Sequence, residues 1–452
     1  MALIGVLLLL MMMSALAAAL TVSGQTETLI VRNELAAAQA QAAAEAGINH
    51  AAEVVTQYIW DWKALGFANV DAAVNDVLAD ADAGSLDGLT TCTGGLDGCG
   101  VEHAIGTAAT VTYYVEIVDD TTGEDGNALS DSNDAILIKA KGTASDGTAV
   151  VLEAIVTPIK LPALITGGNL TISGNVEISA TDPDDASVHS NSNLSITGSA
   201  ADIQGDATAS GTQSCNPSSC SQVEGSHSSG ATELPIPEVH ASDYLVNADY
   251  VLQSTGQMTC NLSGGCTVGA TTYAYNATIC DASSNPHTQC RSGTTDFGWR
   301  FTGGTHWELN EANPTYNTGT YYVKGTPTTV TEVSASPTVI ITIIAETSLS
   351  IAGSPDITPD TPELLFVTDG DLSISGGTDL GDPLTAQGQI LVHEQLSISG
   401  GPDIAGQVIV EDAATLSSLV TSNSISGNAE ITYNGNLGSS YWGISSWRDV
   451  RE

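Results

Sequence analysis

A five-residue pattern recurs along this chain and constrains its fold more than any other feature. LTISG ends at Gly174, LSITG at Gly198, LSIAG at Gly353, LSISG at Gly376 and Gly400, and NSISG at Gly427, with spacings of 24, 23, 24 and 27 residues inside two blocks. Leu and Ile two positions apart point to one face of a strand, and the Gly that follows suits a turn. A period of this size, with strands and little helix signal, predicts a parallel β-helix, a solenoid whose interior is filled by stacked Leu and Ile.

The repeats fall in two blocks, residues 161–205 and 346–452, and the period vanishes between them. We interpret the intervening residues 206–345 as a disulfide-rich insertion. If both blocks belong to one solenoid, they must be adjacent in space, and the insertion must leave and re-enter at neighbouring repeats. One inward position is then shared by Ile172, Ile196, Ile351, Ile374, Ile398 and Ile425.

The first 54 residues predict one long helix. Met1 to Val22 contains no charged residue, and as a helix this run would be about 33 Å long, enough to cross a bilayer core. An Ala-rich stretch of strong helix formers continues the helix, with a break expected at Ser23-Gly24. Residues 55–160 predict an α+β head, with helical signals from Asp71 to Asp82 followed by a meander of strands at 108–118, 135–142 and 149–157.

The N-terminal residues resemble type IV pilin-like proteins of the PilX-type branch. The resemblance is carried by ALIGVLLLL after Met1, the stretch ending Arg32-Asn33-Glu34, and AAEAG at residues 43–47. The C-terminal repeats, ending in GNAEITY at residues 427–433, are similar to C-terminal regions of the same branch. Many major pilins carry Glu at mature position five, where this chain has Gly5, and members of this branch tolerate that change.

The resemblance implies how the chain would be used. A prepilin peptidase would remove a short leader, so that Met1 is the mature and N-methylated first residue. The apolar helices would pack in the core of an extracellular filament through Leu3, Ile4, Leu7, Leu8 and Leu10. The expected partners are further copies of the chain, other pilins and the type IV pilus assembly machinery, with the inner membrane holding the subunit before assembly. The expected fold class is α+β: a pilin helix and β-meander head, then a parallel β-helix with a disulfide-rich insertion.

Two alternative functions stay open at this point. One is a minor or tip pilin that acts as an adhesin through residues 206–345. The other is a membrane-anchored β-helix enzyme acting on polysaccharides. Residues 161–205 and 346–439 contain no Lys or Arg, so nothing there could neutralise an anionic sugar. We therefore expect no catalytic residues, no enzymatic activity and no organic cofactor.

The charge balance limits the kinds of partner that the chain can bind. The chain has 52 Asp plus Glu against 10 Lys plus Arg, a formal net charge of −42. A surface with this balance repels nucleic acid, so we expect no nucleic-acid partner. Side-by-side packing of many copies would need that repulsion to be screened or offset by counter-ions.

The eight cysteines form four close pairs, Cys92/Cys99, Cys215/Cys220, Cys260/Cys266 and Cys280/Cys290. An even count in local pairs predicts disulfides and an oxidising, extracytoplasmic compartment. Zinc is the alternative, but no pair has the CxxC spacing.

Three other features have both a functional and a plain interpretation. Acidic loops could bind calcium, at Asp119, Asp120, Asp125 and Asp131 or at Asp182, Asp184 and Asp185, or could be solvated turns. The aromatic residues around Trp299 and Trp307 could stack on sugars, although we favour a role as core. Asn169, Asn193, Asn261 and Asn276 begin N-x-S/T sequons, which also arise by chance in Ser/Thr-rich sequence.

Overall fold

The computed structural model describes residues 2–60, 70–83, 103–104, 111–119, 135–283, 288–293, 295–310, 318–334, 338–383, 386–413, 416–435 and 441–450. The chain divides into two compact units. Unit 1 contains Met1–Trp60, Asn69–Ile159 and Trp442–Glu452, and unit 2 contains Asp61–Ala68 and Lys160–Tyr441.

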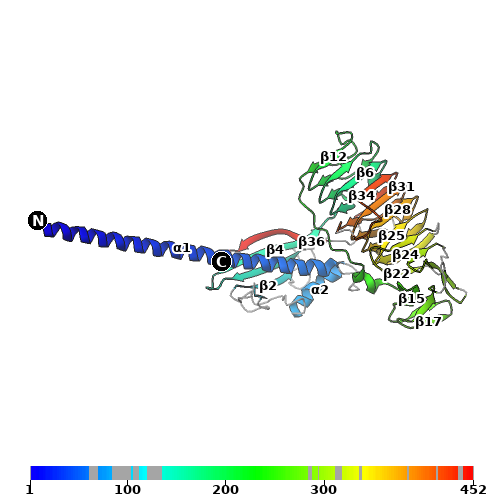
Figure 1. Ribbon diagram of the computed structural model, residues 1–452, viewed down its shortest axis with the longest axis horizontal. Coiled ribbons are helices and arrows are strands. Elements are labelled where there is room, and N and C mark those ends of the chain that lie inside the picture. Colours follow the sequence, from blue (N-terminus) through cyan, green and yellow to red (C-terminus); the bar gives the residue numbers. More distant parts are fainter. Residues whose placement is uncertain are drawn as a thin grey trace. The chain divides into compact units, whose positions relative to one another are not determined.

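Unit 1 consists of two helices and a five-stranded sheet (Figure 1). The helices are α1 (Ala2–Trp60) and α2 (Val70–Ala83). The strands run in the order β1 (His103–Ala104), β2 (Thr112–Asp119), β3 (Ile136–Thr143), β4 (Ala149–Ile159) and β36 (Tyr441–Val450). Strands β1 to β4 pair antiparallel. The predicted helix–meander order is therefore present.

The C-terminal half of α1 packs on this sheet through small and aliphatic side chains. Ile48, Val55 and Ile59 lie in one buried cluster with residues of β2, β3, β4 and α2. A Cβ placed on Gly142 would lie 2.0 Å from the carbonyl oxygen of Ala40, so only glycine fits at this point of β3. The alanines of the helix and this glycine together allow the two backbones to approach closely.

Two sequence-based expectations about unit 1 are wrong. Helix α1 continues without a break through Ser23 and Gly24, because one glycine costs about 1 kcal/mol relative to alanine, which the strong helix formers on both sides outweigh. The C-terminal segment does not belong to the second repeat block, because β36 lies beside β4. There the Arg448 guanidinium donates to Glu153 at 2.7 Å.

Unit 2 is built from three rows of parallel strands (Figure 1). The first row contains, in spatial order, β13 (His227–Ser229), β11 (Ala207–Ala209), β8 (Val188–Ser190), β5 (Leu164–Thr166), β33 (Val408–Val410), β30 (Gly388–Val392), β27 (Glu363–Thr368), β24 (Thr338–Ala345), β22 (Gly319–Val323) and β14 (Tyr250–Leu252).

The second and third rows follow the same spatial order. The second contains β12 (Gln213–Cys215), β9 (Leu194–Ile196), β6 (Leu170–Gly174), β34 (Asn423–Gly427), β31 (Leu396–Gly400), β28 (Leu372–Gly376), β25 (Ser348–Ile351), β23 (Val330–Val333) and β21 (His306–Leu309). The third contains β10 (Asp202–Ile203), β7 (Glu177–Ser179), β35 (Glu430–Thr432), β32 (Asp403–Ala405), β29 (Asp379–Leu380) and β26 (Asp356–Thr358). The start of β24 also pairs with β26.

The recurring pentapeptide forms the second row, and its residues stack in register. The six isoleucines expected to be equivalent pair in one column and are fully buried: Ile351, Ile374, Ile398, Ile425, Ile172 and Ile196. The glycine that ends the pattern has a positive φ in five of its six copies, for example +97° at Gly376. A Cβ there would lie 2.0 Å from the carbonyl oxygen of Gly353, so the repeat needs glycine for both its backbone conformation and its close stacking.

The order of the repeats differs from the expected order. The two blocks are adjacent, as predicted, because β34 pairs with β6. The connecting segment does not leave and re-enter at neighbouring repeats, however. It leaves from the end of the rows at β13 and re-enters at the opposite end, where β14 pairs with β22. The last repeat of the chain thus contacts the first, and the chain enters unit 2 in the middle of the rows.

Residues 230–248, here called the crossing segment, connect the two ends and are held by side chains that follow alternate first-row strands, β8, β33 and β27. Asn191 exchanges two hydrogen bonds with the backbone of Leu234. Glu411 accepts from Val239 N at 3.0 Å, and Asp369 accepts from Ala241 N at 2.6 Å. The hydrogen bond that the His393 ring donates to the Glu411 carboxylate raises the pKa of His393, whose ring lies 5.3 Å from that of His240.

The segment predicted as one disulfide-rich insertion is divided between the two ends of the rows. Cys215–Cys220 closes a loop beside β12 at one end. At the other end, antiparallel strands extend the rows: β15 (Gln257–Cys260), β18 (Thr278–Asp281), β20 (Thr295–Thr302) and β19 (Thr288–Ser292), with the hairpin β16 (Cys266–Val268) and β17 (Thr271–Tyr273). Cys260–Cys266 and Cys280–Cys290 link this cap. Cys92 and Cys99 lie outside the described residues.

An acidic row runs along the outside of the third row. Its members pair in register: Asp356, Asp379, Asp403, Glu430, Glu177 and Asp202. Neighbouring strands lie about 4.8 Å apart, so like charges in register repel one another. Partial burial, and then the neighbouring carboxylates, raise the pKa of Asp379 and of Asp403.

The isoleucine column gives a stability prediction. Ile374→Ala or Ile398→Ala should lower the free energy of unfolding by about 2–5 kcal/mol, because each removes a fully buried side chain. Ser373→Ala, one residue earlier and on the outer face, should change it by less than about 0.5 kcal/mol. Chemical denaturation of the three variants measures this. Equal losses for Ile374 and Ser373 would contradict the inward assignment.

The acidic row gives a pH prediction. A carboxyl whose pKa is raised in the folded state stabilises the fold fully below its ordinary value of 3.8, and that stability is lost as the pH rises through the raised pKa. Asp379→Asn should therefore become more stable relative to wild type as the pH rises above that value. Denaturation across the pH range measures the difference. Asp243→Asn, an exposed carboxylate outside the row, removes the same charge and should show a smaller change.

Candidate functional site

The candidate site is the N-terminal half of α1, whose residues 10–35 we call the exposed arm. Every residue of the arm is exposed, and Ala36 is the first buried residue among the described side chains of the helix. Figure 1 shows the arm extending beyond the sheet of its own unit. At 1.5 Å per residue these positions span about 39 Å.

Large apolar side chains are exposed around the whole circumference of the arm, most densely from residue 10 to residue 22. Its large exposed side chains are Leu10, Met11, Met12, Met13, Leu16, Leu20, Val22, Leu29, Ile30, Val31 and Leu35, each at least 50% exposed. Four consecutive residues, Leu10 to Met13, already point in four directions, since successive helical residues are turned by about 100°. Soluble monomers rarely leave such a surface uncovered, and a helix that is apolar all round is normally buried.

Four hydroxyl groups of the arm form hydrogen bonds within the helix. The hydroxyls of Thr21, Thr26 and Thr28 donate to the carbonyl oxygens of the residues four positions earlier, at 2.8–2.9 Å. The hydroxyl of Ser14 donates to Met11 O at 2.9 Å. An apolar environment could therefore cover these residues without leaving their hydroxyl donors unpaired.

Charge enters the arm only at its C-terminal end. No residue before Glu27 is charged, and Glu27, Arg32 and Glu34 follow. Between the two regions, Gly24 has no neighbouring atom within 4 Å of where a Cβ would lie. A shallow groove crosses the helix there, formed by Leu20, Thr21, Gly24, Gln25, Thr28, Leu29 and Arg32.

The structure describes the side chains of only some of the filament-core residues that the resemblance implies. Leu10 is 62% exposed. Met1 lies outside the described residues, and the side chains of Leu3, Ile4, Leu7 and Leu8 are likewise not described. Among the described residues, no helix is long and apolar enough to cross a membrane.

The predicted calcium ligands are only partly visible. Asp120, Asp125 and Asp131 lie outside the described residues, and Asp119 is buried at the end of β2. Of the second group, Asp182 accepts from Asp184 N at the start of the short helix η1 (Pro183–Ala186). The Lys160 ammonium lies 2.5 Å from Asp185, and this contact raises the pKa of Lys160. No group of three or more acidic, His or Cys side chains that could hold a metal occurs in the described residues.

The aromatic residues of the cap form core, as favoured from the sequence. Trp299 is fully buried and Trp307 is 1% exposed. The indole N–H of Trp307 donates to Gln253 O at 2.9 Å. These rings therefore present no exposed face on which a sugar could stack.

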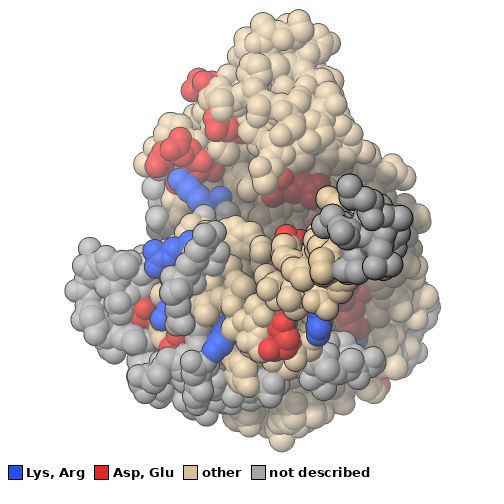
Figure 2. All heavy atoms as spheres, turned by 90° about the vertical axis from the view of Figure 1, so that its left-hand side faces the viewer, with Lys and Arg blue, Asp and Glu red and all other residues tan. Residues whose placement is uncertain are grey.

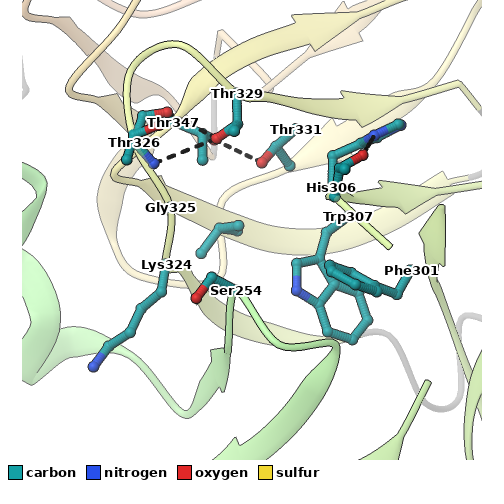
Figure 3. A pocket seen from close by; sticks show the side chains of 12 residues that line it. Ser254, Phe301, His306, Trp307, Lys324, Gly325, Thr326, Thr329, Thr331 and Thr347 are labelled. Carbon is teal, nitrogen blue, oxygen red and sulfur yellow. Dashed lines mark hydrogen bonds between the residues drawn. The ribbon is translucent and has the colours of Figure 1, made fainter. Parts of the chain in front are cut away.

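A small cavity lies beside Trp307 and is lined largely by threonines (Figure 3). Several of those hydroxyls are already hydrogen-bonded, Thr331 to Thr347 at 2.7 Å and Thr329 to Thr326 O at 2.8 Å. The Lys324 side chain extends away from them (Figure 3). His306 also lines the cavity. The exposed arm, with its eleven large apolar side chains, is the stronger candidate.

In the view of Figure 2 the blue side chains are scattered, and most of the described surface is neither acidic nor basic. The described basic residues of the sheet are largely paired with acids, for example Lys139 with Glu116 at 3.4 Å.

Deleting residues 1–35 tests whether the arm is dispensable for folding. The truncated chain should unfold with the same midpoint as the full chain, because the buried cluster of unit 1 begins after the arm. We expect the full chain to self-associate in the absence of detergent and the truncated chain to lose this property. Thermal unfolding and sedimentation measure the two properties, and a large drop in the midpoint would show that the arm stabilises its own subunit.

No family model and no curated protein matches the chain. A solved structure, the competence-associated pilin ComZ from Thermus thermophilus, aligns over 92% of this chain and 98% of its own, with 13% sequence identity and a TM-score of 0.29. That similarity is too low to carry an argument, so the function is inferred from the exposed arm and the unit that holds it.

Proposed function

We propose that the chain is the structural subunit of an extracellular type IV pilus-like filament, in which the exposed arms of many copies pack together. One observation carries the proposal: residues 10–35 are exposed, residues 10–22 are apolar on all sides, and no charge occurs before Glu27. The sequence resemblance of the same residues to pilin-like proteins supports it. The role is structural and not enzymatic.

The energetics favour many neighbours around each arm. Fully burying one Leu or Met side chain contributes about 1.5–3 kcal/mol, and the arm offers eleven large apolar side chains. A single partner helix covers only one face of a helix, whereas a bundle covers all faces. An arm that is apolar all round therefore fits a filament core better than it fits a dimer.

The same proposal places the rest of the chain. The three rows of unit 2 would form a parallel β-helix, and both units would face outward in an oxidising medium that keeps the disulfides formed. The proposal includes other pilins and the assembly machinery as partners, and a precursor held at the inner membrane. Because the net charge is −42, the outward-facing units of neighbouring subunits would repel one another unless salt or cations screened their charge.

Leu16→Asp tests the assembly step. Leu16 is 65% exposed, so the substitution should leave the subunit folded. In a filament core the carboxylate would lose its water, at about several kcal/mol per subunit, and filaments should disappear. Electron microscopy of cell-surface filaments measures this. Ala42→Asp adds the same charge to an exposed position on the half of α1 that packs on the sheet, and filaments should persist.

Stoichiometry separates the main-subunit role from the adhesin alternative. Mass spectrometry of purified filaments should identify this chain as their main protein. A small fraction of it at filament ends would favour the tip adhesin. Normal filaments from the Leu16→Asp variant would refute both roles for the arm.

A further inference from the structure

The four N-x-S/T sequons differ sharply in what their asparagine side chains do. Asn169 and Asn193 belong to a ladder across neighbouring repeats. Asn193 Nδ2 donates to Asn169 Oδ1 at 2.8 Å, and Asn193 Oδ1 accepts from Thr212 N at 2.8 Å. The next two residues of each sequon lie in β6 or β9, which have hydrogen-bonded strands on both sides. A transferase could not enclose these sequons without opening the rows.

The side-chain amide of Asn261 is hydrogen-bonded to the backbone of the crossing segment. Its Nδ2 donates to Leu245 O and to Ala248 O, both at 2.9 Å. A glycan on this nitrogen would remove at least one of these bonds, because substitution leaves one N–H. The side chain therefore anchors the end of the segment.

Asn276 is the exception among the four. It lies in the loop between β17 and β18, and Asn276, Tyr275 and Thr278 are all exposed, Tyr275 by 55%. In the described part of the chain, its side chain makes no hydrogen bond. Its backbone is fixed, with a φ of +62° and a hydrogen bond from Asn276 N to Cys260 O at 2.8 Å. Two disulfides flank the loop, Cys260–Cys266 and Cys280–Cys290.

We propose that Asn276 is an N-glycosylation site, and that the other three sequons stay unmodified. The donor would be an oligosaccharide linked to a polyprenyl diphosphate. Asn276 Nδ2 attacks the anomeric carbon of the first sugar, a new C–N bond forms, and the C–O bond to the diphosphate breaks. Polyprenyl diphosphate leaves with the electron pair, and Nδ2 loses one proton to a base of the transferase. The Thr278 hydroxyl completes the sequon that the transferase recognises.

A plain alternative accounts for the asparagine by its backbone alone, because Asn tolerates a positive φ better than most residues. That alternative does not require an exposed threonine two positions later, and it does not require the Asn276 side chain to lack hydrogen-bond partners. It also predicts no covalent modification, so the two can be separated directly. The proposal does not depend on filament assembly, only on an extracytoplasmic location.

Peptide mass spectrometry of the protein purified from the surface of its native cells tests the proposal. The peptide that contains Asn276 should carry a sugar mass, and those with Asn169, Asn193 and Asn261 should not. Thr278→Ala should remove the modification completely, while Thr278→Ser should retain it. Ser263→Ala, which breaks the Asn261 sequon, should change nothing.

Unreduced peptide maps should show both cap disulfides in all variants, so that loss of sugar cannot be ascribed to misfolding. An unmodified Asn276 in the wild-type protein would overturn the proposal. So would a sugar that persists in Thr278→Ala, or one found on Asn169, Asn193 or Asn261.

Discussion

The stacking of one repeat directly on the next is the interaction on which unit 2 depends. Parallel backbone hydrogen bonds join each strand to its neighbours, and the Leu and Ile of every repeat fill the space between the rows. The spacing is possible because glycines such as Gly376 and Gly400 adopt a positive φ and leave no side chain between repeats. Each repeat therefore hides its neighbour's edges, and only the two ends need protection.

The ends are protected by the segments that lack the repeat. The disulfide loop at Cys215–Cys220 closes one end, and the antiparallel cap with two further disulfides closes the other. The crossing segment joins them, held by Asn191, Glu411 and Asp369 on alternate repeats. A covalently closed cap suits a position where a stack would otherwise present open strand edges to another chain.

Charge and apolar surface are segregated in this protein. The acidic row of unit 2 places like charges in register. These charges keep that surface hydrated and repel the acidic surfaces of other subunits. The exposed arm has no charge before Glu27 and satisfies its own hydroxyls. In the proposed filament, the exposed arms would drive association. The acidic surfaces of neighbouring subunits would repel one another unless ions screened their charge.

The sequence determined the local features of this fold. The pentapeptide repeat predicted the buried isoleucine column, because its period fixes both the strand and the side that faces inward. The composition of residues 1–54 predicted a long helix, and the cysteine pairs predicted the three disulfides found among the described residues. The exposed arm could be located from its lack of charge. The continuity of the helix through Gly24 could not be predicted in this way, because the low helix propensity of one residue is smaller than the summed helix propensity of its neighbours.

What only the tertiary structure decided concerns contacts between distant segments. The repeat pattern is the same in every copy, so it could not show that the last repeat contacts the first or that the connection spans the whole stack. The ten residues of β36 carry no repeat signal, and their pairing beside β4 depends on a sheet edge formed some 280 residues earlier. The four sequons look alike as tripeptides. Only the folded backbone distinguishes the amide of Asn276 from the three that are held in the structure, because hydrogen-bond partners come from neighbours in space.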